Sequence, residues 1–252
     1  MLSWARPARR RRPDSTKEKP ELNVKTTLAV KGGASTRARP SSAPDSADLK
    51  ALIERIEACR ICRDAPQGAR LPHEPRPVIR LSSTARLLVA GQAPGVRVHN
   101  TGVPFNDPSG DRLREWMGVS REVFYDEARV AIIPMGFCFP GHDAAKGDLP
   151  PRRECRAQWH DTLFEMLPQI ETILAIGRYA QAYHFGRLNI PYDKNARLDA
   201  LVGSWREQEG RRPRVIALPH PSWRNNAWLK RNPWFTEEVI PMLRAEVARA
   251  IA

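Results

Sequence analysis

The sequence has no run of about 18 apolar residues, the length that a transmembrane helix requires. Its first residues, Met1–Arg6, are not followed by the apolar segment of a secretory signal. We therefore expect a cytoplasmic protein that does not contact a membrane. Cysteine is also scarce, with four in 252 residues. In a reducing compartment, cysteines bind metals or carry out redox chemistry more often than they form disulfides.

Acidic residues are in deficit: 28 Asp and Glu face 41 Lys and Arg, which gives a formal net charge of +13. Residues 1–46 contain 11 basic and 4 acidic side chains, a net charge of +7, so residues 47–252 carry the remaining +6. A basic excess of this size favours a polyanionic partner, and DNA or RNA is the first candidate. A basic surface that serves only solubility is the alternative.

Residues 1–46 are rich in Arg, Pro, Ser, Ala and Lys and have little apolar periodicity, which predicts a disordered basic N-terminal tail. A helix is expected to begin at Ser46, because apolar residues then recur at helical spacing. These residues are Leu49, Leu52, Ile53 and Ile56. We expect residues 47–252 to form a single folded domain.

Four short apolar runs have the length and composition of buried parallel strands. They are Arg86–Ala90, Val130–Pro134, Thr172–Ile176 and Arg214–Leu218. Helical stretches alternate with them at Gly110–Met117, Arg152–Leu167, Tyr179–Phe185, Asn195–Arg206 and Pro233–Ile251. This alternation predicts a three-layer α/β/α sandwich with a four-stranded parallel sheet. Ligands bind such sheets at the carboxyl ends of the strands, where we expect Gly91, Met135, Gly177 and Pro219.

The four cysteines form one pattern, a C-x-x-C pair followed by two distant single residues. They are Cys59, Cys62, Cys138 and Cys155. A structural zinc site usually pairs two C-x-x-C motifs, and this sequence has only one. Four thiolates from scattered segments suit an iron–sulfur cluster, so we predict a 4Fe-4S cluster. A zinc site and four buried free cysteines are the alternatives.

Several short motifs occur in a fixed order along the chain. They are Gly91-Gln92-Ala93-Pro94-Gly95, Gly102-Val103-Pro104-Phe105, then Gly110 and Leu113, and His220-Pro221-Ser222. Together with the cysteine layout, they resemble the uracil-DNA glycosylase superfamily over roughly residues 51–244. The branch with the greatest resemblance is family four, the iron–sulfur enzymes of bacteria and archaea. The resemblance implies a monomeric bacterial DNA repair enzyme, a monofunctional glycosylase that hydrolyses the N-glycosidic bond of uracil or another deaminated base in DNA.

The resemblance also implies roles for individual residues. The loop that holds Gly91, Gln92 and Ala93 would shape the base pocket and the water site, with Gln92 at the catalytic position. Phe105 would stack on the extruded base, and His220 would stabilise the negative charge on its O2 oxygen. The loop that carries Ser222, Trp223, Arg224 and Asn225 would press into the DNA minor groove. The chemistry agrees, since a departing anionic base needs a hydrogen-bond donor in a dry pocket and a flat partner.

The sequence departs from the family pattern at three places. Gln92 replaces a glutamate and cannot act as a base, although it still forms hydrogen bonds. Val98 and His99 replace an acidic pair. Pro134, four residues before Cys138, replaces the asparagine that reads uracil and offers no donor. These changes leave a second possibility, a catalytically silent or diverged iron–sulfur protein that binds DNA. A zinc-stabilised α/β protein of unrelated function is a third.

Overall fold

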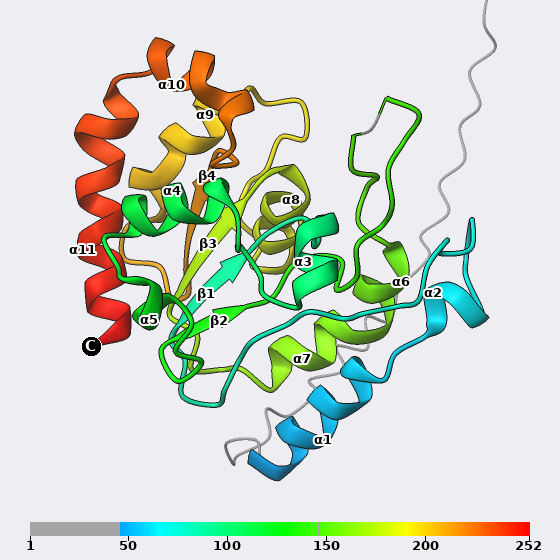
Figure 1. The fold of residues 1–252 in the computed structure, drawn as a ribbon. Helices are drawn as coiled ribbons and strands as arrows, with labels where there is room; N and C mark the ends of the chain where they lie inside the picture. The colour runs from blue at the N-terminus through cyan, green and yellow to red at the C-terminus, as the bar shows by residue number, and fades with distance from the viewer. Residues whose placement is uncertain (1–45, 146) are drawn as a thin grey trace, which may run out of the picture. The chain divides into compact units, whose positions relative to one another are not determined.

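Four parallel strands form one sheet in the order β2-β1-β3-β4 (Figure 1). The strands are β1 (Leu87–Ala90), β2 (Val130–Ile132), β3 (Thr172–Ile176) and β4 (Arg214–Leu218). All four predicted strands are confirmed, although β2 ends two residues before the predicted Pro134. This computed structural model describes residues 46–145 and 147–252. Apart from Ser46, the predicted basic tail lies outside the described residues.

Helices precede, connect and follow the strands. The α-helices are α1 (Ser46–Glu57), α2 (Ile61–Asp64), α3 (Val96–Thr101), α4 (Pro108–Met117), α5 (Arg121–Phe124), α6 (Arg153–Cys155), α7 (Asp161–Glu165), α8 (Arg178–Arg187), α9 (Leu198–Gly203), α10 (Asn226–Arg231) and α11 (Ile240–Ile251). Two π-helical turns, η1 (Arg156–His160) and η4 (Phe235–Val239), and two 3₁₀ turns, η2 (Ser204–Gln208) and η3 (Trp223–Asn225), complete the order.

Three helix predictions need correction. The predicted helix Arg152–Leu167 is interrupted by the π-helical turn η1, and the helix predicted from Pro233 contains the π-helical turn η4 before α11 begins. The helix predicted from Asn195 begins at Leu198 instead, because the Asp193 side chain accepts a hydrogen bond from the Asn195 N–H at 2.7 Å and stabilises a turn there. Helices α2, α3, α5 and α10 are too short to produce a periodic signal.

Residues alternate along each strand between two hydrophobic clusters. Leu87 and Val89 of β1 pack in one cluster with residues of α4, α5 and α11. Leu88 and Ala90 pack in the other with residues of α1, α7 and α8. Figure 1 shows α4 and α11 on one side of the sheet and α1 and α7 on the other. The three-layer α/β/α sandwich with a four-stranded parallel sheet is therefore confirmed.

A buried polar network anchors α11 at the amino ends of the strands. Glu246 of α11 accepts hydrogen bonds from Thr172 Oγ1 at 2.8 Å, Arg214 Nη1 at 3.2 Å and Arg249 Nη2 at 2.7 Å. Thr172 and Arg214 are the first residues of β3 and β4. A buried carboxylate is tolerated only with such partners, so the network fixes this end of the sheet, opposite the end where ligands bind in this class of fold.

None of the helices in the described ranges is long and apolar enough to cross a membrane.

Candidate functional site

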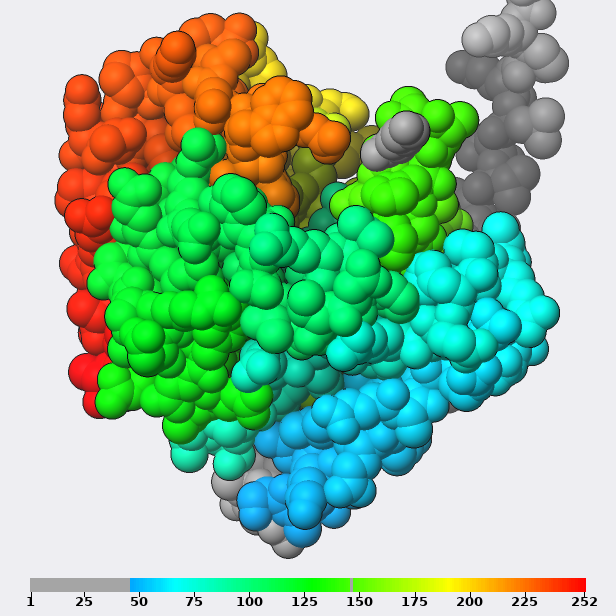
Figure 2. Space-filling model, viewed as in Figure 1, coloured from blue at the N-terminus to red at the C-terminus, as the bar shows by residue number. Residues whose placement is uncertain are grey.

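A pocket of about 540 Å³ lies at the carboxyl ends of the strands. The segment that follows each strand contributes to its wall, through Gly91, Pro134, Gly177 and His220. Figure 2 shows the surface hollowed between an orange segment near residue 225 and a light-green segment near residue 145. The pocket therefore occupies the place that the strand order predicts for a ligand.

The Gly91–Gly95 loop forms one wall of this pocket, and all five of its residues line it. Its start is held to the segment after β2, because the carbonyls of Gly91 and Gln92 accept hydrogen bonds from the N–H groups of Met135 and Gly136, both at 2.9 Å. The Gln92 side chain donates to the Leu149 carbonyl at 3.4 Å. The loop is thus fixed to two neighbouring segments.

Phe105 faces the pocket from a strained backbone position, with φ of 52°. Its carbonyl accepts a hydrogen bond from Arg114 Nη1 at 3.3 Å, and its ring meets Phe124 edge-on at 5.9 Å between centroids. The Phe105 carbonyl oxygen passes so close to Gly110 that a Cβ at position 110 would lie 1.8 Å from it. Gly110 is therefore the residue that permits this conformation.

His220 lines the pocket just after β4 and is solvent-exposed. The surrounding wall nevertheless desolvates the ring and lowers its pKa; Asp107 and Asp148 oppose this effect, and Arg224 adds to it. The Ser222 N–H donates to His220 Nδ1 at 3.2 Å. Since Nδ1 accepts, the neutral ring carries its proton on Nε2, which can donate to a ligand in the pocket.

The loop after His220 forms the rim of the pocket. Trp223 is the large apolar side chain with the highest exposure among the described residues, at 73%, and the Arg224 guanidinium lies 5.9 Å from its ring centroid. The Asn225 side chain donates to the His220 carbonyl at 2.7 Å. Arg112 of α4 donates to the Ser222 carbonyl at 3.3 Å. Two hydrogen bonds thus hold a loop that presents an indole to solvent.

The structure brings together in this pocket every residue that the sequence predicted for catalysis, base binding and DNA contact. They are Gly91, Gln92, Ala93, Phe105, His220, Ser222, Trp223, Arg224 and Asn225. Pro134 also lines the pocket, so the departure at this position lies within the candidate site.

Three polar side chains that reach the pocket were not predicted: Asp107, Ser109 and Asp148. Asp107 is the N-cap of α4, where its side chain accepts from the Gly110 N–H at 3.0 Å and from Ser109 Oγ at 2.6 Å. The sequence Asp-Pro-Ser-Gly is a helix-start signal that could have identified it. No local sequence pattern identifies Asp148, because it reaches the pocket only through the folding of the segment between β2 and α6.

Other polar residues near the motifs lie outside the pocket lining. His99, at the position of the second residue of the missing acidic pair, packs against His73 with ring centroids 4.4 Å apart, and burial lowers its pKa. Asn106 accepts a hydrogen bond from Arg121 at 3.1 Å. His99, Asn106 and Asn100 do not line the pocket.

The four cysteines are grouped away from this pocket. Cys155 shares a hydrogen bond with Cys62, which lowers the pKa of Cys62 to about 7. Burial raises the pKa of Cys138 to about 12, and charge on Cys62 and Cys59 acts in the same direction. The Phe137 N–H donates to Cys155 Sγ at 3.4 Å. Cys62 and Cys155 are therefore in contact, and Cys138 is near enough to respond to charge on Cys59 and Cys62, although the cysteines come from distant segments.

The cysteines are free, and no group of three or more His, Cys, Asp or Glu side chains in the described residues has the arrangement of a single-ion site. A zinc ion requires about four ligands to converge on one atom. An iron–sulfur cluster is held by four thiolates around a larger centre. The cluster and the zinc site both stay predictions.

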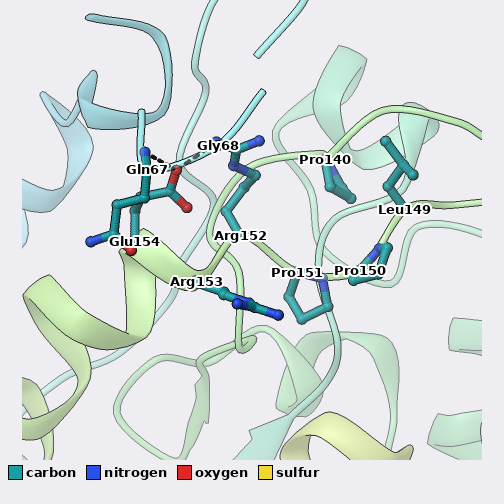
Figure 3. A pocket seen from close by; sticks show the side chains of 9 residues that line it. All are labelled: Gln67, Gly68, Pro140, Leu149, Pro150, Pro151, Arg152, Arg153 and Glu154. Atoms are coloured by element: carbon teal, nitrogen blue, oxygen red, sulfur yellow. Dashed lines mark hydrogen bonds and ion pairs between the residues drawn. The ribbon is translucent and has the colours of Figure 1, made fainter. Parts of the chain in front are cut away.

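A second pocket of about 340 Å³ includes two residues next to the cysteine segments, Arg153 and Glu154 (Figure 3). The buried Glu154 accepts hydrogen bonds from the Gln67 N–H at 3.1 Å and from Arg152. Arg152 also donates to the Ala69 carbonyl at 2.7 Å. These contacts hold the chain after α2 against the start of α6, so we interpret this region as a structural contact between the two segments.

Comparison with known proteins agrees with the motifs. Residues 80–244, more than half of the chain, match the family model described as Uracil DNA glycosylase superfamily. Among solved structures, the chain is similar to SMUG2 of Pedobacter heparinus, with 14% sequence identity and a TM-score of 0.38. That match covers 64% of this chain and 76% of the Pedobacter chain.

Proposed function

We propose that this chain, which belongs to the uracil DNA glycosylase superfamily, hydrolyses the N-glycosidic bond of a deaminated base in DNA. The observation that carries the proposal is the pocket at the carboxyl edge of the sheet, where Phe105 and His220 face one cavity. A cavity of about 540 Å³ is large enough for one extruded nucleotide base.

His220 would act on the leaving base. As the bond between C1′ and the base breaks, the electron pair moves onto the base and its oxygen becomes negative. A neutral imidazole with its proton on Nε2 can donate a hydrogen bond to that oxygen. The hydrogen bond from the Ser222 N–H to Nδ1 supports this tautomer, and the lowered pKa keeps the ring neutral near pH 7.

Phe105 and Trp223 would hold the DNA. The Phe105 ring offers a flat face for the extruded base, and its strained backbone is already formed without DNA. Trp223 is exposed at the rim, where an indole can enter the base stack and fill the space that the base leaves. Arg224 beside it can contact a phosphate.

Pro134 and Gln92 bear on which base the chain would release. In the resembling family an asparagine reads uracil at the position of Pro134, and proline has neither a side-chain donor nor an N–H. Gln92 can form hydrogen bonds but cannot take a proton from water. Uracil is our first candidate, and hypoxanthine and xanthine are the alternatives. A diverged protein that binds damaged DNA without cutting it is the second candidate function, which these two residues favour.

The proposed activity is tested with single- and double-stranded oligonucleotides that contain uracil, hypoxanthine, xanthine or a mismatch. We expect abasic product from at least one of them. The His220→Ala variant should form this product about 100-fold more slowly, the usual effect of removing a donor to a developing anion. No product above the His220→Ala level from any substrate would contradict the proposal. Tight binding of damaged duplex without cleavage would instead support the DNA-binding alternative.

We also propose that Cys59, Cys62, Cys138 and Cys155 hold a 4Fe-4S cluster. The interactions among their thiols and the N–H donor at Cys155 support this choice, since backbone hydrogen bonds to sulfur are typical of cluster sites. None of the four lines the pocket, so the cluster would brace the fold rather than take part in base release.

A further inference from the structure

Base hydrolysis also requires a water molecule to reach C1′, and the residues of the first motif do not supply a base for it. Gln92 has no proton-accepting carboxylate, and neither Val98 nor His99 is acidic. Two carboxylates nevertheless line the pocket, Asp107 and Asp148. Asp107 lies at the start of α4, whereas Asp148 lies between β2 and α6.

Asp107 is already engaged as a helix cap. Its Oδ1 accepts hydrogen bonds from the Gly110 N–H and from Ser109 Oγ, which are the contacts that begin α4. These two donors keep Oδ1 in the cap, where it forms the first turn of the helix. Asp107 is therefore better suited to positioning α4 and Phe105 than to activating water.

Asp148 has a different environment, in the hairpin whose described parts, residues 141–145 and 147–149, pair in antiparallel orientation. His142 pairs with it across the hairpin, and His142 Nδ1 lies 3.1 Å from Asp148 Oδ1. The hairpin is fixed beside the Gly91–Gly95 loop, because Gln92 donates to the neighbouring Leu149 carbonyl. The second oxygen, Oδ2, faces Gly95 and would lie 3.7 Å from a Cβ placed there. One oxygen is thus held while the other is directed at the loop that forms the pocket wall.

We propose that Asp148 is the general base of this site, a catalytic residue supplied by the hairpin instead of the first motif. The inference rests on the proposed glycosylase function. Asp148 Oδ2 accepts a proton from water as the water oxygen bonds to C1′. The bond between C1′ and the base breaks, and its electron pair leaves with the base, whose oxygen is held by His220 Nε2–H. The base anion then takes up a proton from solvent and Asp148 releases its proton to solvent, so that the elements of water are divided between the sugar and the base.

The position of Asp148 fits this role. Its side chain is 49% exposed in the free protein, and bound DNA would cover the pocket mouth and exclude bulk water. His142 is the matching orienting group, since an imidazole that donates to one carboxylate oxygen fixes the direction of the other. Asp148 and His220 both line the pocket, so water and leaving base can be handled from separate walls.

Single-turnover cleavage of the substrate that the wild-type chain prefers tests this proposal. Asp148→Asn should lower the rate by about 100-fold or more, in the range of general base catalysis, with the Kd for DNA unchanged. Asp148→Ala should regain rate when formate is added, because formate can occupy the vacated space. Asp143→Asn removes the same charge from the same hairpin outside the pocket, and its amide oxygen can still accept the turn hydrogen bonds. That control should keep the wild-type rate.

The outcomes separate the two proposals. An active wild-type chain whose Asp148→Asn variant reacts at a similar rate would overturn the role of Asp148 alone. The same holds if Asp107→Asn is the slow variant and Asp148→Asn is not, or if Asp148→Asn weakens DNA binding without slowing cleavage. A wild-type chain that releases none of the bases would overturn both the role and the proposed function.

Discussion

At the scale of single residues, the contact between Phe105 and Gly110 decides the shape of the pocket. Phe105 adopts a positive φ that costs about 1–3 kcal/mol in a non-glycine residue. The cost is met by packing, because the ring rests on Phe124 and the carbonyl is held by Arg114. This arrangement exists only while position 110 has no side chain, so the glycine of α4 contributes to a site that it does not line.

We expect Gly110→Ala to lower the free energy of unfolding by about 3 kcal/mol, as overpacking does when backbone must move. The new Cβ would lie 1.8 Å from the Phe105 carbonyl oxygen. Gly186→Ala in α8 is the matched control, since nothing lies within 4 Å of its Cβ. It should stabilise the protein by about 1 kcal/mol. Urea denaturation measures both, and equal effects would contradict the steric argument.

The candidate residues could be predicted from the sequence only where they follow a strand or belong to a motif. Gly91 follows β1 directly and His220 is the second residue after β4, so the parallel sheet places both at one edge. Asp148 follows neither a strand nor a helix. Its position depends on the hairpin contact with His142 and on the hydrogen bond from Gln92 to Leu149, and neither contact has a periodic signal.

At the scale of elements, the rim loop is a rigid support for one exposed side chain. Arg112 and Asn225 fix the backbone around η3, while Trp223 itself is 73% exposed. An exposed indole contributes little to folding, so its orientation toward solvent has no stabilising value in the free protein. In the proposed function, the loop would present this indole to DNA.

We expect Trp223→Ala to change the free energy of unfolding by less than about 0.5 kcal/mol, since the side chain is exposed. Cleavage of double-stranded substrate should fall by about tenfold or more, because stacking on one base is worth about 1–3 kcal/mol. Single-stranded substrate, which needs no base extrusion from a duplex, should be affected less. Trp223→Phe keeps a flat face and should retain most activity. Equal losses on both substrates would argue against a wedge.

The strands and the longer helices could be predicted from the sequence, whereas the short helices could not. The four strands were identified because buried parallel strands are short continuous apolar runs bounded by glycine, proline and polar residues. The one-turn helix α2 and the six-residue helix α3 depend on tertiary contacts that no local pattern encodes. The π-helical turns of η1 and η4 split helices whose apolar periodicity continues across them, so the pattern predicted one helix in each case.

At the scale of the whole molecule, the cysteines connect parts of the chain that the sheet does not. Cys59 and Cys62 follow α1, whereas Cys138 follows β2 and Cys155 lies in α6. Glu154 and Arg152 add a second connection between the same segments. The pocket is formed by other residues, so the region around the cysteines, which holds the N-terminal helices, is separate from the edge to which we assign the chemistry.

This separation predicts that Cys138→Ser affects stability and spares catalysis. The variant should lose its iron, which we expect at about four atoms per wild-type chain. Its Tm should fall by about 10 °C or more, since a structural metal centre contributes several kcal/mol and about 1 kcal/mol shifts Tm by about 2–4 °C in a domain of this size.

The cleavage rate per folded molecule of Cys138→Ser at low temperature should stay close to wild type, because the cysteines do not line the pocket. Ala58→Ser, an exposed change beside Cys59, should alter neither property. Zinc in place of iron in the wild-type chain would contradict the cluster, and loss of cleavage in folded Cys138→Ser protein would contradict the separation of the cysteine region from the site.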